Sequence, residues 1–345
     1  MTLVEPSTTS AQQHTLETDL KDQTGYQEII LVENLQSAFF IALSTLPKER
    51  SVLCSPNAPL ALFFALHQLR MDAEYCDLRL DGTIESRFLE RSVSDSIGAI
   101  VLSHHFGICS DTQKAETLCH QNSHLFLEDA SQSFYNKRKS GASIVIFSLD
   151  LLIDPTLGEG SFLATDDPEV AATLRALVDG GYQKTKLWNY DLLTPEPKHH
   201  LSRLFIDHAL KNMDALQTDA LQIAHLQQRY LKELRSNRLI ELPQEKQLSP
   251  YPLFPIALVP ALFCPKEGIY EALREANIDV QVGNKPIYKT TAFKDDTLSM
   301  FGAEEIFKAQ LLLPCNPELQ EEDLLYIIEN LQNVLETYSY RGCSF

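Results

Sequence analysis

The sequence lacks several features that would assign it to a common class of protein. It has no run of about 18 apolar residues, the length that a membrane-spanning helix requires. Its seven cysteines include no CxxC pair, so no zinc site or disulfide framework is indicated. Basic residues are few, with 29 Lys and Arg against 47 Asp and Glu. The resulting net charge of −18 argues against nucleic acid as a partner.

The start of the chain lacks the pattern of a signal peptide. Residues 1–24 are polar, with no basic start followed by an apolar core. We therefore expect a cytoplasmic protein with reduced thiols, and a polar, mobile tail over residues 1–24.

Short apolar runs alternate with helical stretches from about residue 25 to 180, which predicts an α/β domain with a mainly parallel sheet. Two helical patterns then fill residues 198–236, and a smaller α+β unit follows. The predicted domains are residues 25–235 and 236–345. The predicted strands of the large domain are 28–33, 51–55, 73–78, 98–105, 124–129, 143–149 and 161–166, and its helices 37–46, 58–71 and 111–122.

Polar residues lie at the carboxyl ends of three of the predicted strands, at the edge where parallel sheets bind ligands. They are His104, Asp129 and Ser148. An acid at the position of Asp129 can hold a protonated ring nitrogen of a cofactor, or it can cap a helix. His104 and His105, with two histidines further on, have no carboxylate at ligand spacing, so no metal is predicted.

Several motifs follow one another along the chain in a characteristic order. The sequence reads "AIVLSHHFG", "HLFLEDASQ", "SIVIFSLDLLIDPTLGEGSFLATDD" and "LWNY", and later "AEEIFKAQLLLPCNPELQEEDLLYIIENL". Over residues 25–335 this series resembles the DegT/StrS-type nucleotide-sugar aminotransferases, a fold-type I family dependent on pyridoxal phosphate. The resemblance implies a three-layer α/β/α large domain and a smaller C-terminal α+β domain.

It also implies roles for individual residues. Positions matching Asp129 and Gln132 hold the cofactor ring in that family, and the serine matching Ser148 binds its phosphate. The asparagine matching Asn189 reaches the phosphate across a dimer interface. The family also has a histidine near the cofactor, and we expect His104 to be the matching residue.

One departure bears directly on chemistry. The family loop reads F-S-F-H-P-T-K-x-x-x-x-G-E-G-G, and its lysine forms the Schiff base. Laid on residues 147–161 without a gap, the lysine position is Ile153. An aliphatic side chain can neither form an imine nor carry a proton, so no catalytic residue is assigned.

Three further departures lie in the same site. Where the family has S-G-T at the start of a helix, this chain has Leu35 and Gln36, preceded by Glu33. An acid there would repel a phosphate unless it points to solvent. The aromatic platform over the ring is replaced near Asn57, and "VGNKPIYKTT" lacks the family's histidines.

These observations favour a catalytically degenerate member of the family that acts as a binding or partner subunit. It would be a homodimer, or a heterodimer with an active aminotransferase, and could take a nucleotide sugar. Pyridoxal or pyridoxamine phosphate would bind weakly or not at all, and no metal, membrane or nucleic acid is expected. The alternatives are an enzyme that binds its cofactor non-covalently and a small-ligand binder without cofactor.

Overall fold

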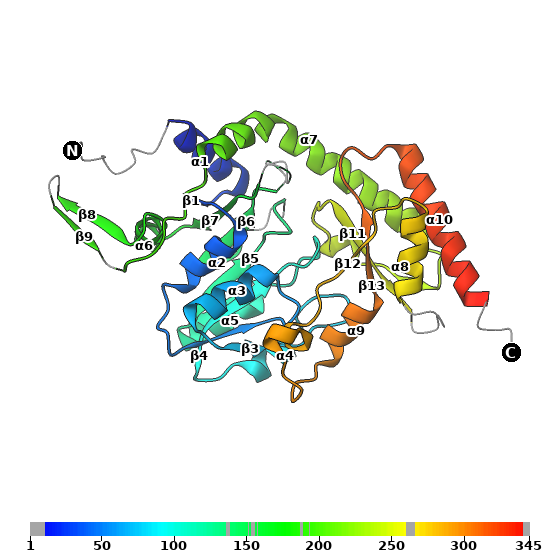
Figure 1. The fold of residues 1–345 in the computed structure, drawn as a ribbon, viewed down its shortest axis with the longest axis horizontal. Coiled ribbons are helices and arrows are strands. Elements are labelled where there is room, and N and C mark those ends of the chain that lie inside the picture. The colour runs from blue at the N-terminus through cyan, green and yellow to red at the C-terminus, as the bar shows by residue number, and fades with distance from the viewer. Residues whose placement is uncertain are drawn as a thin grey trace.

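The structure of the protein is a computed structural model, which describes residues 11–135, 139–150, 152, 156, 158–186, 189–192, 194–259 and 266–340. Figure 1 shows two units side by side, joined by one long helix that arches over both. Among the described residues, no helix is both long and apolar enough to cross a membrane.

The large unit is built on a seven-stranded sheet of order β1-β7-β6-β5-β4-β2-β3. The four pairs from β3 to β6 are parallel, and β7 runs antiparallel to both neighbours. The predicted mainly parallel sheet is confirmed. Its strands are β1 (Glu28–Val32), β2 (Ser51–Cys54), β3 (Ala73–Tyr75), β4 (Ile97–Ser103), β5 (Leu125–Asp129), β6 (Ile144–Ser148) and β7 (Ser161–Thr165).

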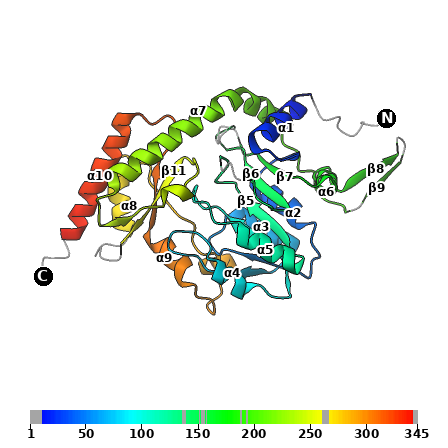
Figure 2. The same ribbon diagram turned by 180° about the vertical axis from the view of Figure 1, so that it is seen from behind.

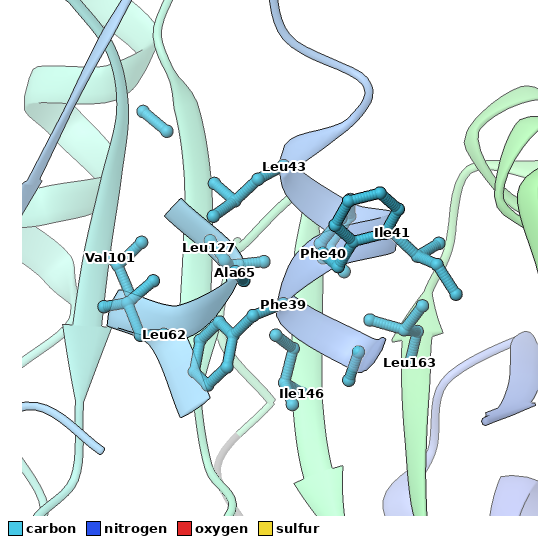
Figure 3. Close-up of a cluster of buried hydrophobic side chains, with 14 of the residues drawn as sticks. Phe39, Phe40, Ile41, Leu43, Leu62, Ala65, Val101, Leu127, Ile146 and Leu163 are labelled. Carbon is cyan, nitrogen blue, oxygen red and sulfur yellow. The ribbon is translucent and has the colours of Figure 1, made fainter. Parts of the chain in front are cut away.

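Helices cover both faces of this sheet, which confirms the three-layer architecture. On one face lie α2 (Leu35–Leu43), α3 (Leu60–Leu69) and α6 (Pro168–Val178), whose apolar side chains share one core with the strands. The helix α2 is apolar nearly all round, and Figure 3 shows its Phe39 and Leu43 between α3 and the sheet. The opposite face, seen in Figure 2, carries α4 (Ser86–Ser92) and α5 (Gln113–Asn122).

Residues 11–24 differ from the predicted mobile tail, because they form the helix α1 (Ala11–Thr24). Leu16 and Leu20, one turn apart, are fully buried against β1 and the start of the long helix. The two leucines occupy one stripe of a helix whose other faces are polar. Two apolar residues are too few to reveal an amphipathic helix from the composition of this segment. Residues 1–10 lie outside the described part of the chain.

The two helices expected over 198–236 are a single helix, α7 (Arg203–Leu234). Its first half packs in the core of the large unit, and its second half packs in that of the small unit. The small unit has a four-stranded sheet of order β10-β11-β13-β12. Its elements are β10 (Ile240–Glu241), β11 (Leu253–Leu258), α8 (Lys266–Glu275), β12 (Gln281–Val282), β13 (Gln310–Pro314) and α10 (Glu321–Tyr340), with a 3-10 turn at Glu245–Gln247. Between β12 and β13 the chain returns to the large unit, where the 3-10 turns Ile287–Lys289 and Thr291–Phe293 and the helix α9 (Phe301–Ala309) place apolar side chains in its cores.

A two-stranded hairpin completes the fold. It consists of β8 (Tyr182–Lys186) and β9 (Asn189–Leu192), and Figure 1 shows it projecting at the end of the molecule opposite to the small unit. The rings of Tyr182 and Tyr190 stack at 5.1 Å, although the side chain of Tyr190 is 63% exposed.

Candidate functional site

Asp129 ends the apolar strand β5 and is only 1% exposed. Its carboxylate accepts a hydrogen bond of 3.1 Å from the backbone N–H of Ser131. The residue therefore closes a turn, and it does not cap a helix as one interpretation of the sequence allowed. Burial raises the pKa of the Asp129 carboxyl, because the charged form loses solvation.

A cavity of about 750 Å³, the site cavity, lies over the carboxyl ends of β5 and β6. Ser131, Ser148 and Ser161 line it, together with Leu35 and Gln36 from the start of α2. Ser148 and Ser161 are direct partners in the antiparallel β6–β7 pair, so their side chains share one face of the sheet. The structure thus brings Ser148 to a cavity of ligand size.

Two other predicted cofactor-binding residues, Gln132 and His104, have partners within the protein. The side-chain oxygen of Gln132 accepts a hydrogen bond of 2.8 Å from the N–H of Phe106. The Nε2 atom of His104 lies 2.8 Å from a carboxylate oxygen of Glu128, and its Nδ1 accepts from the N–H of Ser110 at 3.1 Å. Both ring nitrogens of His104 are engaged, and it does not line the site cavity.

The neighbouring His105 was not assigned a role from the sequence. It is buried, and its Nε2 has no hydrogen-bond partner among the described residues. Burial, reinforced by the adjacent His104, lowers the pKa of His105 to about 4. His105 lies two residues beyond the end of β4 and is not among the described residues that line the site cavity.

Asn189 stands apart from the site cavity of its own chain. It begins β9 on the projecting hairpin, and it is exposed. Asn57, where an aromatic platform was missing, is buried and donates from Nδ2 to the carbonyl oxygens of Asn284 (2.8 Å) and Ala303 (3.2 Å). It therefore connects the large unit to the segment that returns from the small one.

The start of α2, which would face a phosphate, already has polar partners. The side chain of Asn34 caps the helix by accepting from the N–H of Ser37 at 2.8 Å. Glu33 does not line the site cavity, and its carboxylate has partners within the protein. Its carboxylate lies 2.9 Å from the Ser37 hydroxyl and 3.0 Å from Nδ1 of His199.

The charged residues in the described lining of the site cavity are all acidic. Asp150, Glu159 and Asp279 contribute carboxylates, and no Lys, Arg or His is present among the described lining residues. Asp279 is paired with Arg274. Tyr251 also lines the cavity, and burial together with the nearby charges of Asp150 and Asp129 raises the pKa of its hydroxyl.

Ile153, at the lysine position, belongs to the undescribed part of the loop between β6 and β7. Residues 135–140, between β5 and β6, are rich in basic residues, and 136–138 are likewise undescribed. Lys139 is described, and its Nζ donates to the carbonyl of Gly25 at 2.9 Å and to Asp166 at 2.8 Å. It is therefore held on the face of the sheet that α1 covers.

No group of three or more His, Cys, Asp or Glu residues in the described part is arranged to hold a metal ion. Tyr251 and Ser161 are two of the cavity residues that the sequence did not reveal. Tyr251 comes from a proline-flanked connection before β11, and only the tertiary fold brings it beside β5. Ser161 could have been found, because it directly follows the Gly-Glu-Gly turn and opens a strand.

A mainly parallel seven-stranded sheet with helices on both faces, a small C-terminal α+β unit and an acid at the end of β5 define the class of fold-type I, pyridoxal phosphate-type aminotransferases. Solved structures agree on the fold. A Helicobacter pylori aminotransferase involved in the biosynthesis of pseudoaminic acid superimposes with a TM-score of 0.86 at 21% identity, covering 95% of this chain and 92% of that one. A Bacillus subtilis protein solved with bound cofactor PMP gives 0.83 at 20% identity, covering 95% and 78%.

The sequence comparison gives the family. The model of the DegT/DnrJ/EryC1/StrS aminotransferase family matches residues 6–332, and the chain belongs to this family. Among its relatives, a UDP-4-amino-4,6-dideoxy-N-acetyl-beta-L-altrosamine transaminase of Campylobacter jejuni (serotype O:2) is 26% identical over 338 residues, covering 94% of this chain and 90% of the relative. A Helicobacter pylori protein of the same name is 24% identical over 281 residues, covering 76% and 73%.

Proposed function

We propose that this protein is a family member that has lost transamination and uses its site to bind a ligand, as a binding or partner subunit. The observation that carries the proposal is Ile153 in place of the family lysine. Transamination needs an amine that bonds to the cofactor and then carries a proton between the α-carbon of the substrate and the cofactor. A hydrocarbon side chain provides neither group.

The surroundings of the site offer no replacement amine among the described residues. The site cavity has no lysine in its described lining, and Lys139 is engaged with Gly25 and Asp166 elsewhere. The loop position of Asp150, which is histidine in the family pattern, is acidic here. These differences support a loss of chemistry that extends beyond a single residue.

The cofactor would then bind weakly or not at all. Asp129 keeps the acid that the family uses for a protonated ring nitrogen, but it is buried and is not among the described residues that line the site cavity. The phosphate end does not fit, because its described lining has no cation and Asp150 places a carboxylate beside Ser148. Asn34 also competes for the N–H of Ser37 at the helix end where anions bind in related folds.

The projecting hairpin supports a dimer in which copies complete each other's sites. Asn189 is exposed on this hairpin, and at the rim of the site cavity Leu60 and Phe64 of α3 are 49% and 45% exposed. A hairpin from a second copy, or from an active aminotransferase of the same family, would cover these apolar side chains. The ligand would then be a nucleotide sugar, as the names of the relatives suggest.

A turnover assay tests the proposal. Purified protein is incubated with pyridoxal phosphate, L-glutamate and a UDP-linked 4-keto sugar, and 2-oxoglutarate is measured beside an Ile153→Lys variant. We expect no product from the natural chain. Steady production of 2-oxoglutarate by the natural chain would overturn the proposal and favour the second candidate, an enzyme that holds its cofactor non-covalently through Asp129.

A further inference from the structure

We propose that the edge of the large sheet formed by β3 binds an extended peptide segment of a partner protein, in which apolar and acidic residues alternate. The segment adds to the sheet as a further strand beside β3. This inference goes beyond the proposed function and does not depend on it, because no residue of β3 is among the described residues that line the site cavity. It rests on the backbone of β3, on an aromatic wall beside it, and on two arginines.

The backbone of β3 has groups available for a further strand. β3 is the last strand in the order of the sheet, and among the described strands it pairs only with β2. The carbonyl of Asp72 and the N–H of Cys76 both bond to β2, each at 2.9 Å. Alternate residues of a parallel pair bond to the same neighbour, so the N–H and C=O groups of Ala73 and Tyr75 point away from β2. They have no backbone partner among the described residues.

The opposite edge of the same sheet is covered. At β1, the guanidinium of Arg175 donates to the carbonyl of Ile29 at 3.2 Å, and α1 packs against the strand. At β3 there is instead a cavity of about 1210 Å³, the edge cavity, which all three residues of the strand line. Small ligands usually occupy about 300–1,000 Å³, so this volume favours a peptide, which can add to an open sheet edge. Because β3 is short, side-chain contacts must supply most of the affinity.

An aromatic wall lies on the side of the edge cavity that faces α3. Ala73 and Tyr75 pack against the core on that side of the sheet. The ring centroid of Tyr75 lies 6.4 Å from that of Phe63 and 6.1 Å from that of Tyr288, and Phe293 lies 6.4 Å from Phe63. Aromatic side chains pack well at such distances, and Tyr75 and Phe293 are partly exposed. Every second residue of the added strand, on the side of α3, should therefore be apolar.

The intervening residues of the added strand face the side of α4, where a basic residue is available. Arg91, in the last turn of α4, lines the edge cavity, as does Arg70 at the end of α3. Both arginines are exposed, and neither has an ion-pair partner among the described residues. A guanidinium group binds a carboxylate through two parallel hydrogen bonds, so acidic residues suit these positions.

The edge cavity also contains carboxylates, but most have donors within the chain. Glu74 accepts from the hydroxyl of Ser96 at 2.6 Å. Asp295 accepts from the hydroxyl and the N–H of Thr297, at 2.6 and 2.9 Å. Asp72 is the one carboxylate in the described lining without such a donor. Two unpaired arginines against one such carboxylate favour acidic residues in the peptide.

The test uses synthetic peptides. Binding of fluorescein-labelled EFEFE to the full chain is measured by fluorescence anisotropy near neutral pH at low salt, beside the reordered peptide EEFFE and the neutral peptide QFQFQ. We expect EFEFE to bind about tenfold or more tightly than either. Two further versions of EFEFE carry N-methyl groups, on the phenylalanine amides in one and on the glutamate amides in the other. An added strand uses one of its two backbone edges, so only one version should lose binding.

Variants place the effect at β3. Ala73→Pro removes an N–H that points away from β2, a position where an edge strand tolerates proline, and it should weaken binding of EFEFE about tenfold or more. Arg91→Gln should remove most of the preference for EFEFE over QFQFQ. Arg87→Gln, an exposed arginine on α4 outside the described lining, is the matched control and should leave all affinities unchanged. Circular dichroism shows whether each variant is folded; if Ala73→Pro is not, Arg91→Gln and the methylated peptides decide.

Several results would overturn the inference: no binding of EFEFE, equal binding of EFEFE and EEFFE, equal effects of the two methylation patterns, or unchanged binding to folded Ala73→Pro. Sedimentation of the peptide-free chain provides a further check. A change in oligomeric state caused by Ala73→Pro would mean that the edge pairs with a second copy, and the inference would be wrong. Failure of the proposed function is distinguishable, because it appears as 2-oxoglutarate in the turnover assay and not in these titrations.

Discussion

Replacing His105 should make the stability of the protein less sensitive to acid. In the folded chain, burial lowers the pKa of this imidazole to about 4, against an ordinary value of 6.5. The unfolded state therefore binds a proton more readily than the native state. The contribution of the neutral His105 side chain to the free energy of unfolding is fully present above pH 6.5, and it is lost as the pH falls from there towards 4.

The size of the effect follows from the two pKa values. Each unit of pKa difference corresponds to about 1.4 kcal/mol, so the complete contribution is about 3 kcal/mol. Between pH 7 and pH 5, about 2 kcal/mol of this amount should disappear. Burial of Asp129 acts in the opposite direction, because its raised pKa favours proton uptake by the folded chain in acid.

The assay is urea unfolding at pH 7 and pH 5 for the natural chain, His105→Asn and His225→Asn. The last variant replaces an exposed histidine on α7 and serves as the control. From pH 7 to pH 5, the free energy of unfolding should fall in both proteins. We expect the fall in the natural chain to be about 2 kcal/mol larger than the fall in His105→Asn. An equal fall in the two proteins would refute a buried, neutral His105.

Three further predictions follow from local packing. Leu16→Ala should lower the free energy of unfolding by about 2–5 kcal/mol, because the side chain of Leu16 in α1 is fully buried. Thr18→Ala, on the exposed side of α1, should have little effect. Equal effects of the two variants in thermal denaturation would contradict docking of α1. Asn34→Ala should cost about 1 kcal/mol through loss of the α2 cap, measured by urea unfolding, and no change would argue against the cap. Ser161→Ala should stabilise the ligand-free chain by about 1 kcal/mol, since a buried hydroxyl without a partner is removed, and a loss of stability would mean that the hydroxyl has a partner.

Most of the sheet could be predicted from the sequence because its strands are short, apolar and separated by clear helical patterns. The run 97–103, buried along its whole length, is an example. The helix α1 was missed because only Leu16 and Leu20 mark its buried stripe. The single helix α7 was divided in two because it packs first against one core and then against another, which a local pattern cannot show.

The site was predictable where a residue ends a strand and unpredictable where tertiary contacts decide. Asp129 and Ser148 lie at strand ends as expected. His104 was assigned to the site, but its pairing with Glu128 depends on a neighbouring strand. Glu33 contacts His199, and Tyr251 lines the site cavity beside residues that follow β5 and β6. These contacts join residues far apart in the sequence, so they cannot be predicted from local sequence spacing.

The central claim is that the chain forms no covalent bond with a pyridoxal cofactor. The most direct test treats the natural chain and Ile153→Lys with pyridoxal phosphate, reduces both with borohydride, and maps the modified peptides by mass spectrometry. We predict modification of the peptide containing residue 153 in the variant, and in the natural chain no lysine modified beyond the level of an unfolded control. Full modification of one particular lysine in the natural chain would contradict the account.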